Sequence, residues 1–173
     1  MGFFSKLFDK NKKEQIIARN PFNLQINDIV DYDLVEYQVI GKIKYNEEGY
    51  IWYDYHLFDS KEHLWLYAED DDEVRLGLFR KLGVDHQLYA KFQEEIPSVI
   101  KYEGMDYSLI EEGSANIEIE GKVGARDGQR IKYWDYETGN GNQLSVEKWG
   151  NELEISVGEK VQESLLEFYP ASG

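Results

Sequence analysis

Two short segments of the chain set a carboxylate among aromatic rings, a combination that can bind a cation. The first is Trp52-Tyr53-Asp54-Tyr55 and the second is Trp134-Asp135-Tyr136. A carboxylate attracts an ammonium or guanidinium group, and the face of an aromatic ring attracts the same groups electrostatically. In one groove, such side chains would accept a lysine, an arginine or a polyamine-like cation. The candidate binding surface consists of Trp52, Asp54, Tyr55, Trp65, Trp134, Asp135 and Tyr136.

A competing interpretation assigns the same rings to the hydrophobic core. Aromatic side chains of small β domains mostly pack inward, and each aspartate would then only form hydrogen bonds in a turn or at the rim of the domain. The sequence leaves both interpretations open.

The polar residues give little indication of metal binding or catalysis. His56 and His63 lie on successive predicted strands with Asp54 and Asp59 nearby, but a zinc site needs three or four converging ligands, and no tight spacing supplies them. The acidic run at residues 70–72 lacks the glycine and the terminal glutamate of an EF-hand loop. The chain has no cysteine and no Gly-x-Ser-x-Gly nucleophile elbow. We therefore expect no catalytic residues, no metal and no cofactor, and a protein that is not an enzyme.

Charge is distributed unevenly along the 173 residues. The chain carries a net charge of −15, whereas residues 1–20 contain five basic and two acidic side chains. An acidic body repels phosphates, so we expect no nucleic-acid partner. A basic protein partner, a cationic ligand or simple solubility all remain compatible with this charge.

The first twenty residues predict a basic amphipathic leader helix. Apolar side chains recur at helical spacing with lysines on the other side, and the segment is too short to span a bilayer. Such a helix suits the headgroup region of an anionic membrane, and docking on its own domain or in an oligomer is the alternative. The predicted membrane contacts are Phe3, Phe4, Lys6, Leu7, Phe8 and Lys10.

The elements that position the aromatic and acidic residues are predicted to be strands. Aromatic residues make up 14% of the chain and only three prolines occur, which favours pleated, half-buried structure. Alternating segments separated by turns predict an all-β fold of about a dozen short strands, with one short helix around residues 87–94. These strands include 36–45, 50–58, 63–69, 74–81, 106–111, 114–123, 130–137 and 143–148.

An internal repeat suggests how these strands are organised. Residues 30–40 match residues 100–110 without a gap, with identity at three of the eleven positions. The offset of 70 residues exceeds a solenoid period. The match predicts two related antiparallel β units in tandem, either small barrels or sandwich halves, at 24–82 and 99–169 with a connector at 83–98. It also predicts that residues 53–55 and 134–136 occupy pseudo-equivalent positions.

Several motifs together resemble a bacterial family known as domain of unknown function 4178. The resemblance covers about residues 24–160 and lies in a Tyr-x-Val-x-Gly strand at 37–41, a Trp-x-[Glu/Asp]-Tyr-x-Leu stretch at 52–57 and a Trp-Leu-x-x-Glu stretch at 65–69. In the second half, residues 102–107, 133–136 and 144–149 also fit. The resemblance implies no established activity. It implies a gene context of membrane-stress systems of the phage-shock or ESCRT-III-like type.

Two functional expectations follow. The first is a cytoplasmic, non-enzymatic adaptor with a protein partner, held at the inner face of the cytoplasmic membrane by its leader in a membrane-stress system. The second is a soluble ligand-binding module that takes a cationic small molecule or a basic peptide on the aromatic and acidic residues.

Overall fold

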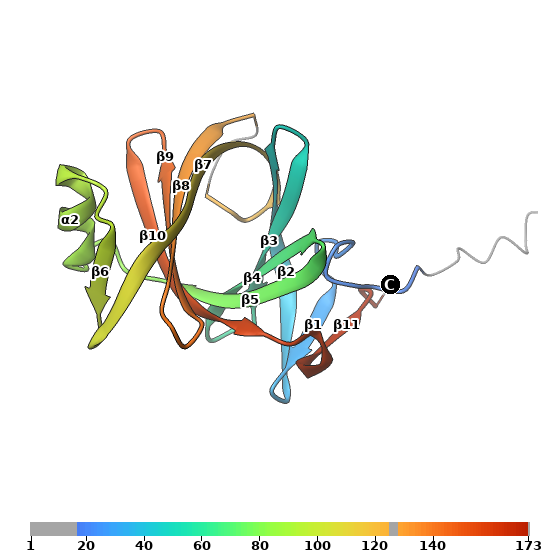
Figure 1. Ribbon diagram of the computed structural model, residues 1–173. Coiled ribbons are helices and arrows are strands. Elements are labelled where there is room, and N and C mark those ends of the chain that lie inside the picture. The colour runs from blue at the N-terminus through green and yellow to red at the C-terminus, as the bar shows by residue number, and fades with distance from the viewer. Residues whose placement is uncertain (1–16, 125–127, 173) are drawn as a thin grey trace, which may run out of the picture.

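The protein forms an all-β structure built around one closed barrel (Figure 1). The structure is a computed structural model that describes residues 17–124 and 128–172. Eight strands form the barrel wall in the order β2-β3-β4-β5-β10-β9-β8-β7, and β7 pairs with β2 to close it. The wall strands are β2 (Val35–Glu47), β3 (Tyr50–Phe58), β4 (His63–Asp71), β5 (Glu73–Lys81), β7 (Met105–Gly121), β8 (Arg130–Glu137), β9 (Asn142–Trp149) and β10 (Glu152–Val161).

The remaining elements cover the outside of the barrel in two groups. Strands β1 (Ile29–Tyr32) and β11 (Leu166–Tyr169), with the short 3-10 helix η2 (Glu163–Leu165), extend the sheet next to β2. Helix α2 (Leu88–Glu94) and strand β6 (Val99–Tyr102) lie on the opposite side (Figure 1). Within the described residues, no helix is long and apolar enough to cross a membrane.

The prediction of two tandem β units is wrong, because strands from the two halves pair at two seams. Residues 41–46 of β2 pair with 116–121 of β7, and residues 76–81 of β5 pair with 156–161 of β10. Each half alone would leave its edge strands open, and closure of the barrel removes those edges. Both halves therefore share one wall and one interior.

The repeated residues form two hairpins of matching register. In the first, Ile29 lies opposite Gln38 and Tyr32 opposite Val35; in the second, Val99 lies opposite Ser108 and Tyr102 opposite Met105. The match ends before the aromatic strands. At the offset of 70 residues, Gly41 of β2 corresponds to Glu111 of β7. Gly41 pairs with His56 of β3, whereas Glu111 pairs with Asp135 of β8, so Asp135 corresponds to His56 and not to Asp54. Asp54 and Asp135 are therefore two positions out of register, and the predicted pseudo-equivalence of 53–55 and 134–136 is wrong.

A glycine pair allows the close approach of β2 and β7 at the first seam. Gly41 and Gly121 are paired residues. A Cβ atom on Gly41 would lie 2.5 Å from the carbonyl oxygen of Lys122, and Gly121 has a φ of 68°, in the left-handed region. A side chain at either position would push the strands apart or strain the backbone.

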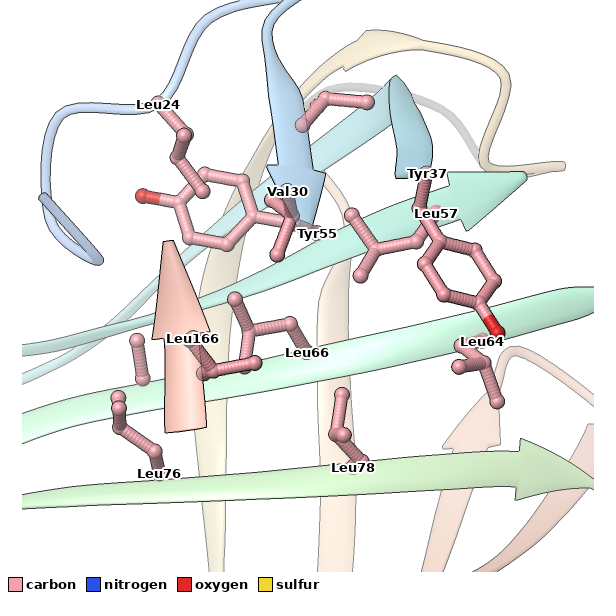
Figure 2. Close-up of a cluster of buried hydrophobic side chains, with 12 residues drawn as sticks. Leu24, Val30, Tyr37, Tyr55, Leu57, Leu64, Leu66, Leu76, Leu78 and Leu166 are labelled. Carbon is pink, nitrogen blue, oxygen red and sulfur yellow. The ribbon is translucent and has the colours of Figure 1, made fainter. Parts of the chain in front are cut away.

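Three hydrophobic clusters stabilise this arrangement. The β1-side cluster lies between β1, β11 and the outer face of β2–β5, and includes Leu24, Val30, Tyr55, Leu66 and Leu166 (Figure 2). The α2-side cluster packs Leu88 and Phe92 of α2 against the outer face of β7–β10. The third cluster, called the barrel plug below, lies inside the barrel and comprises Ile43, Tyr45, Trp52, Trp65, Ala115, Ile117, Val123, Ile131, Tyr133 and Trp149.

Candidate functional site

The part of the barrel interior that the plug leaves open forms a cavity of about 380 Å³. Successive side chains of a strand point to opposite faces of the sheet, so every second residue of a wall strand faces this space. On β3 these include Trp52 and Asp54, and on β8 they include Tyr133 and Asp135. The cavity is large enough for a small organic molecule.

The lining of the cavity is strongly acidic. Among the described residues, eight acidic and three basic side chains line it, which is a formal excess of five negative charges. Three ion pairs use the basic groups: Lys81 with Glu154 at 3.0 Å, Lys160 with Glu137 at 2.8 Å, and Arg75 with Glu73 at 3.2 Å. Arg75 also reaches Glu69 at 3.8 Å. No basic side chain of the described chain lies within ion-pairing distance of the other four acids, Asp54, Glu111, Asp135 and Glu147.

The first acidic centre joins β2, β3 and β9 through one hydroxyl group. The hydroxyl of Tyr45, which is fully buried, lies 2.9 Å from Oδ2 of Asp54 and 2.9 Å from Oε1 of Glu147. A tyrosine hydroxyl has a single proton to donate, so it cannot satisfy two carboxylates at once. The indole Nε1 of Trp149 donates to Oε2 of Glu147 at 2.9 Å and fixes that side chain.

Burial and mutual repulsion favour a proton on this centre. Burial raises the pKa of Asp54 and, together with the repulsion from Asp54, raises the pKa of Glu147. The hydrogen bond from Tyr45 and the positive charge of Lys81 lower both pKa values in part. One carboxyl group of the pair therefore keeps a proton at a pH at which an exposed carboxyl group would have lost it.

The second acidic centre lies on β8 and β7. Oδ1 of Asp135 accepts a hydrogen bond from the Ser145 hydroxyl at 2.8 Å, and Glu111 is its partner residue across β7–β8. Oδ2 of Asp135 has no hydrogen-bond donor among the described residues. Burial, opposed in part by the hydrogen bond from Ser145 and assisted by the nearby negative charge of Glu111, raises the pKa of Asp135 to about 7.

A third acidic residue, Glu69, lies near the place where the cavity opens to solvent. Glu69 accepts hydrogen bonds from the hydroxyls of Tyr50 and of Tyr67, the latter at 2.6 Å. Arg75, Ile110 and Lys160 also line the cavity and are each at least half exposed. They mark the opening at the end of the barrel where β4 turns into β5 and β10 ends.

Rigid aromatic rings form much of the remaining wall. Trp52 stacks on Tyr45 with ring centres 5.1 Å apart, and it forms an edge-to-face contact with Tyr133 at a distance of 5.5 Å between ring centres. Tyr67 and Phe79 contact each other edge to face on the neighbouring strands β4 and β5. Side chains packed in this way keep their positions, so the carboxylates among them are held in fixed places.

The cavity already contains one ammonium group of the chain itself. Nζ of Lys81 lies 4.1 Å from the ring centre of Trp65 while it pairs with Glu154. An aromatic face and a carboxylate thus hold a primary ammonium in this wall.

The structure separates the predicted binding surface into two sets. Trp52, Asp54, Trp65 and Asp135 line the cavity together. Tyr55 belongs to the β1-side cluster, and Trp134 packs against the α2-side cluster. Tyr136 borders the cavity but is part of the α2-side cluster, where its hydroxyl donates to the carbonyl oxygen of Pro97 at 2.8 Å.

The predicted membrane contacts lie outside the described residues. They are Phe3, Phe4, Lys6, Leu7, Phe8 and Lys10, all within the first sixteen residues. The membrane-adaptor role therefore stays a prediction.

The two histidines of β3 and β4 form a hydrogen-bonded pair. Nε2 of His56 lies 2.8 Å from Nδ1 of His63, and Nδ1 of His56 lies 2.7 Å from the carbonyl oxygen of Lys122. That carbonyl can only accept, so Nδ1 of His56 carries a proton and donates it. Within the part of the chain that the structure describes, no three histidine or acidic side chains converge so as to hold a metal ion.

Comparison with known proteins places this barrel in a family. The family described as domain of unknown function DUF4178 matches residues 25–163, which include all eight wall strands. The chain belongs to the DUF4178 family. Related proteins include the uncharacterized protein Mb2628 of Mycobacterium bovis and the uncharacterized protein Rv2597 of Mycobacterium tuberculosis. Each is 28% identical over 151 residues, which cover 83% of this chain and 70% of the relative. No solved structure matches the DUF4178 chain significantly.

Several cavity residues of this DUF4178 protein were not predicted from its sequence. Tyr45, Tyr67, Glu111 and Glu147 all face the interior. Glu69 and Glu147 lie near the ends of strands with alternating character, but only the closure of the barrel brings them close to the acidic residues of other strands. The sequence did contain one usable signal, because successive side chains of a strand point to opposite faces of the sheet. This alternation places Asp54 and Tyr55 on opposite faces, and it places Asp135 on the face opposite to Trp134 and Tyr136.

Proposed function

We propose that the barrel cavity of this DUF4178 protein binds a small organic cation that carries ammonium groups. The observation that carries the proposal is a set of three enclosed carboxyl groups, Asp54, Asp135 and Glu147, that have no basic partner among the described residues. The exposed Glu111 lies beside Asp135 and adds a fourth unpaired carboxylate to the lining. Burial of an unpaired charge is unfavourable, and a bound cation would offset that penalty.

The chemistry of the wall favours an organic cation over a metal ion. Metal ions need several oxygen or nitrogen ligands around one point, and no such group occurs among the described residues. Aromatic rings instead surround the carboxylates, and Lys81 shows how Trp65 and a glutamate together accept a primary ammonium. Alkylammonium ligands match this lining because their methylene groups pack on the rings while their nitrogens pair with the carboxylates.

Thermal unfolding of the full chain tests the proposal. We expect n-butylamine and 1,4-diaminobutane to raise the melting temperature in a concentration-dependent manner, because a ligand that binds only the folded state stabilises it. The uncharged 1,4-butanediol, and NaCl at the same ionic strength, serve as controls for cosolvent and screening effects. Both should leave the melting temperature nearly unchanged.

Two variants show whether any stabilisation arises in the cavity. Glu147→Gln removes a carboxyl group from the cavity, whereas Glu118→Gln removes one from a side chain of β7 that is 77% exposed. We expect the first to weaken the effect of the amines and the second to leave it unchanged. No stabilisation by any amine, or equal stabilisation in the two variants, would refute cation binding by the cavity.

A further inference from the structure

We infer that the preferred ligand is a short linear diamine whose two ammonium groups occupy the two acidic centres together. This inference rests on the proposed cation-binding function and goes beyond it, because a single ammonium group would need only one centre. The first centre is the pair Asp54 and Glu147 joined by Tyr45, and the second is Asp135 with Glu111.

The strand register fixes the spacing of the two centres. Tyr133 is the partner of Glu147 across β8–β9, and Asp135 is the partner of Ser145. Asp135 and Glu147 are therefore diagonal neighbours on the inner face, for which Cα atoms lie about 7–8 Å apart.

The hydrogen bonds of each carboxylate keep the centres separate. Glu147 is held by the hydroxyl of Tyr45 and the indole of Trp149, which lies two residues further from Ser145 along β9. Asp135 is held by Ser145, directly opposite it. These hydrogen bonds fix the two carboxyl groups at separate positions along the barrel wall.

The surface between the centres suits a short aliphatic chain. The ring of Tyr133 projects from the inner face directly opposite Glu147 and two residues from Asp135, so it neighbours both residues. The phenol of Tyr67 lies near Asp135 from the other side of the cavity. A chain of about four methylene groups is long enough to bridge the diagonal spacing between Asp135 and Glu147. Methylene groups can pack on these rings, whereas a more polar linker would lose its hydration there.

Titration calorimetry with three probes tests the inference on the full chain. The probes are 1,4-diaminobutane, the monoamine n-butylamine and the longer 1,8-diaminooctane. The second ammonium of a matched diamine binds at a high effective concentration, so we expect 1,4-diaminobutane to bind at least about tenfold more tightly than n-butylamine. The longer diamine should lose most of that advantage because its ends overshoot the two centres.

Variants of each centre complete the test. Asp135→Asn and Glu147→Gln should each reduce the affinity for 1,4-diaminobutane to that for n-butylamine, while Glu118→Gln should retain the full difference. Equal affinity of the wild type for the monoamine and the diamine overturns the inference but leaves cation binding standing. Absence of binding by all three amines overturns both, and a urea titration of each variant confirms that it is folded.

Discussion

Replacement of Asp135 by asparagine should stabilise the unliganded protein, and more so at alkaline pH. Burial raises the pKa of Asp135 from 3.8 to about 7, so the folded protein holds a proton that the unfolded chain loses between these values. The wild-type free energy of unfolding therefore falls as the pH rises through this window, and the fall is complete above pH 7. Each pH unit within the window lowers the free energy of unfolding by about 1.4 kcal/mol. Asparagine does not ionise, so the variant should show no such decrease.

The pH interval can be chosen to avoid precipitation near the isoelectric point of about 4.6. Between about pH 5.5 and 8.5, ionisation of Asp135 should lower the wild-type free energy of unfolding by about 2 kcal/mol, because the decrease continues only up to about pH 7. The free energy of unfolding of Asp135→Asn should not show this decrease. The hydrogen bond from Ser145 survives, because the amide oxygen of asparagine can accept it. Urea titrations at the two pH values measure the difference.

The control for Asp135→Asn is Asp106→Asn, whose side chain is 63% exposed on β7. Its effect on the free energy of unfolding should change little between the two pH values. If Asp135→Asn shows the same difference from the wild type at both pH values, or destabilises the protein more at pH 8.5, the buried-charge reasoning is refuted.

Three further predictions concern ligand binding, the barrel seam and the leader. Amine affinity should rise with pH through about 7 and level off above it, because a bound ammonium favours the ionised form of Asp135; calorimetry that finds no pH dependence would contradict this. Gly121→Ala should lower the free energy of unfolding by about 1–3 kcal/mol through strain at its φ of 68°, whereas Gly139→Ala, with open space around it, should change it little in the same urea titration. Deletion of residues 1–13 should abolish co-sedimentation with anionic liposomes if the leader is a membrane contact; unchanged binding, or none by the intact chain, would refute that role.

Local sequence signals predicted most strands but not their partners. The expected strands 50–58 and 130–137 have the bounds of β3 and β8, because alternating residues and turn residues mark both ends. Expected strands 106–111 and 114–123 are instead one long strand, β7. Gly113 lies in the gap expected between these two strands, yet it pairs with Tyr133, and a Cβ atom there would lie 2.6 Å from the Tyr133 hydroxyl. This glycine therefore allows close packing within a continuous strand.

The same limit applies to the candidate site. Asp54 and Asp135 were identified from their aromatic neighbours, but most of those neighbours point to the outside of the barrel, where Tyr55 and Trp134 pack under β1 and α2. The rings that do line the cavity with these aspartates come from other strands, such as Tyr67 of β4 and Tyr45 of β2. Contacts of this kind depend on the closure of the barrel, for which no local pattern exists.

The two ends of the barrel interior argue for a ligand. At the plug, the chain fills the barrel with Trp52, Ile117 and other apolar side chains, which is the stabilising way to use such a space. Immediately next to it, the same strands place Asp54, Asp135 and Glu147 in the interior, where burial raises their pKa values and makes their ionised forms unfavourable. Folding alone gives no reason for that choice, since apolar residues on the same strands would give a more stable barrel. A cation that enters the cavity turns each of these unfavourable charges into a favourable contact, and this is why the acidic end, rather than the larger hydrophobic clusters, is the place to look for function.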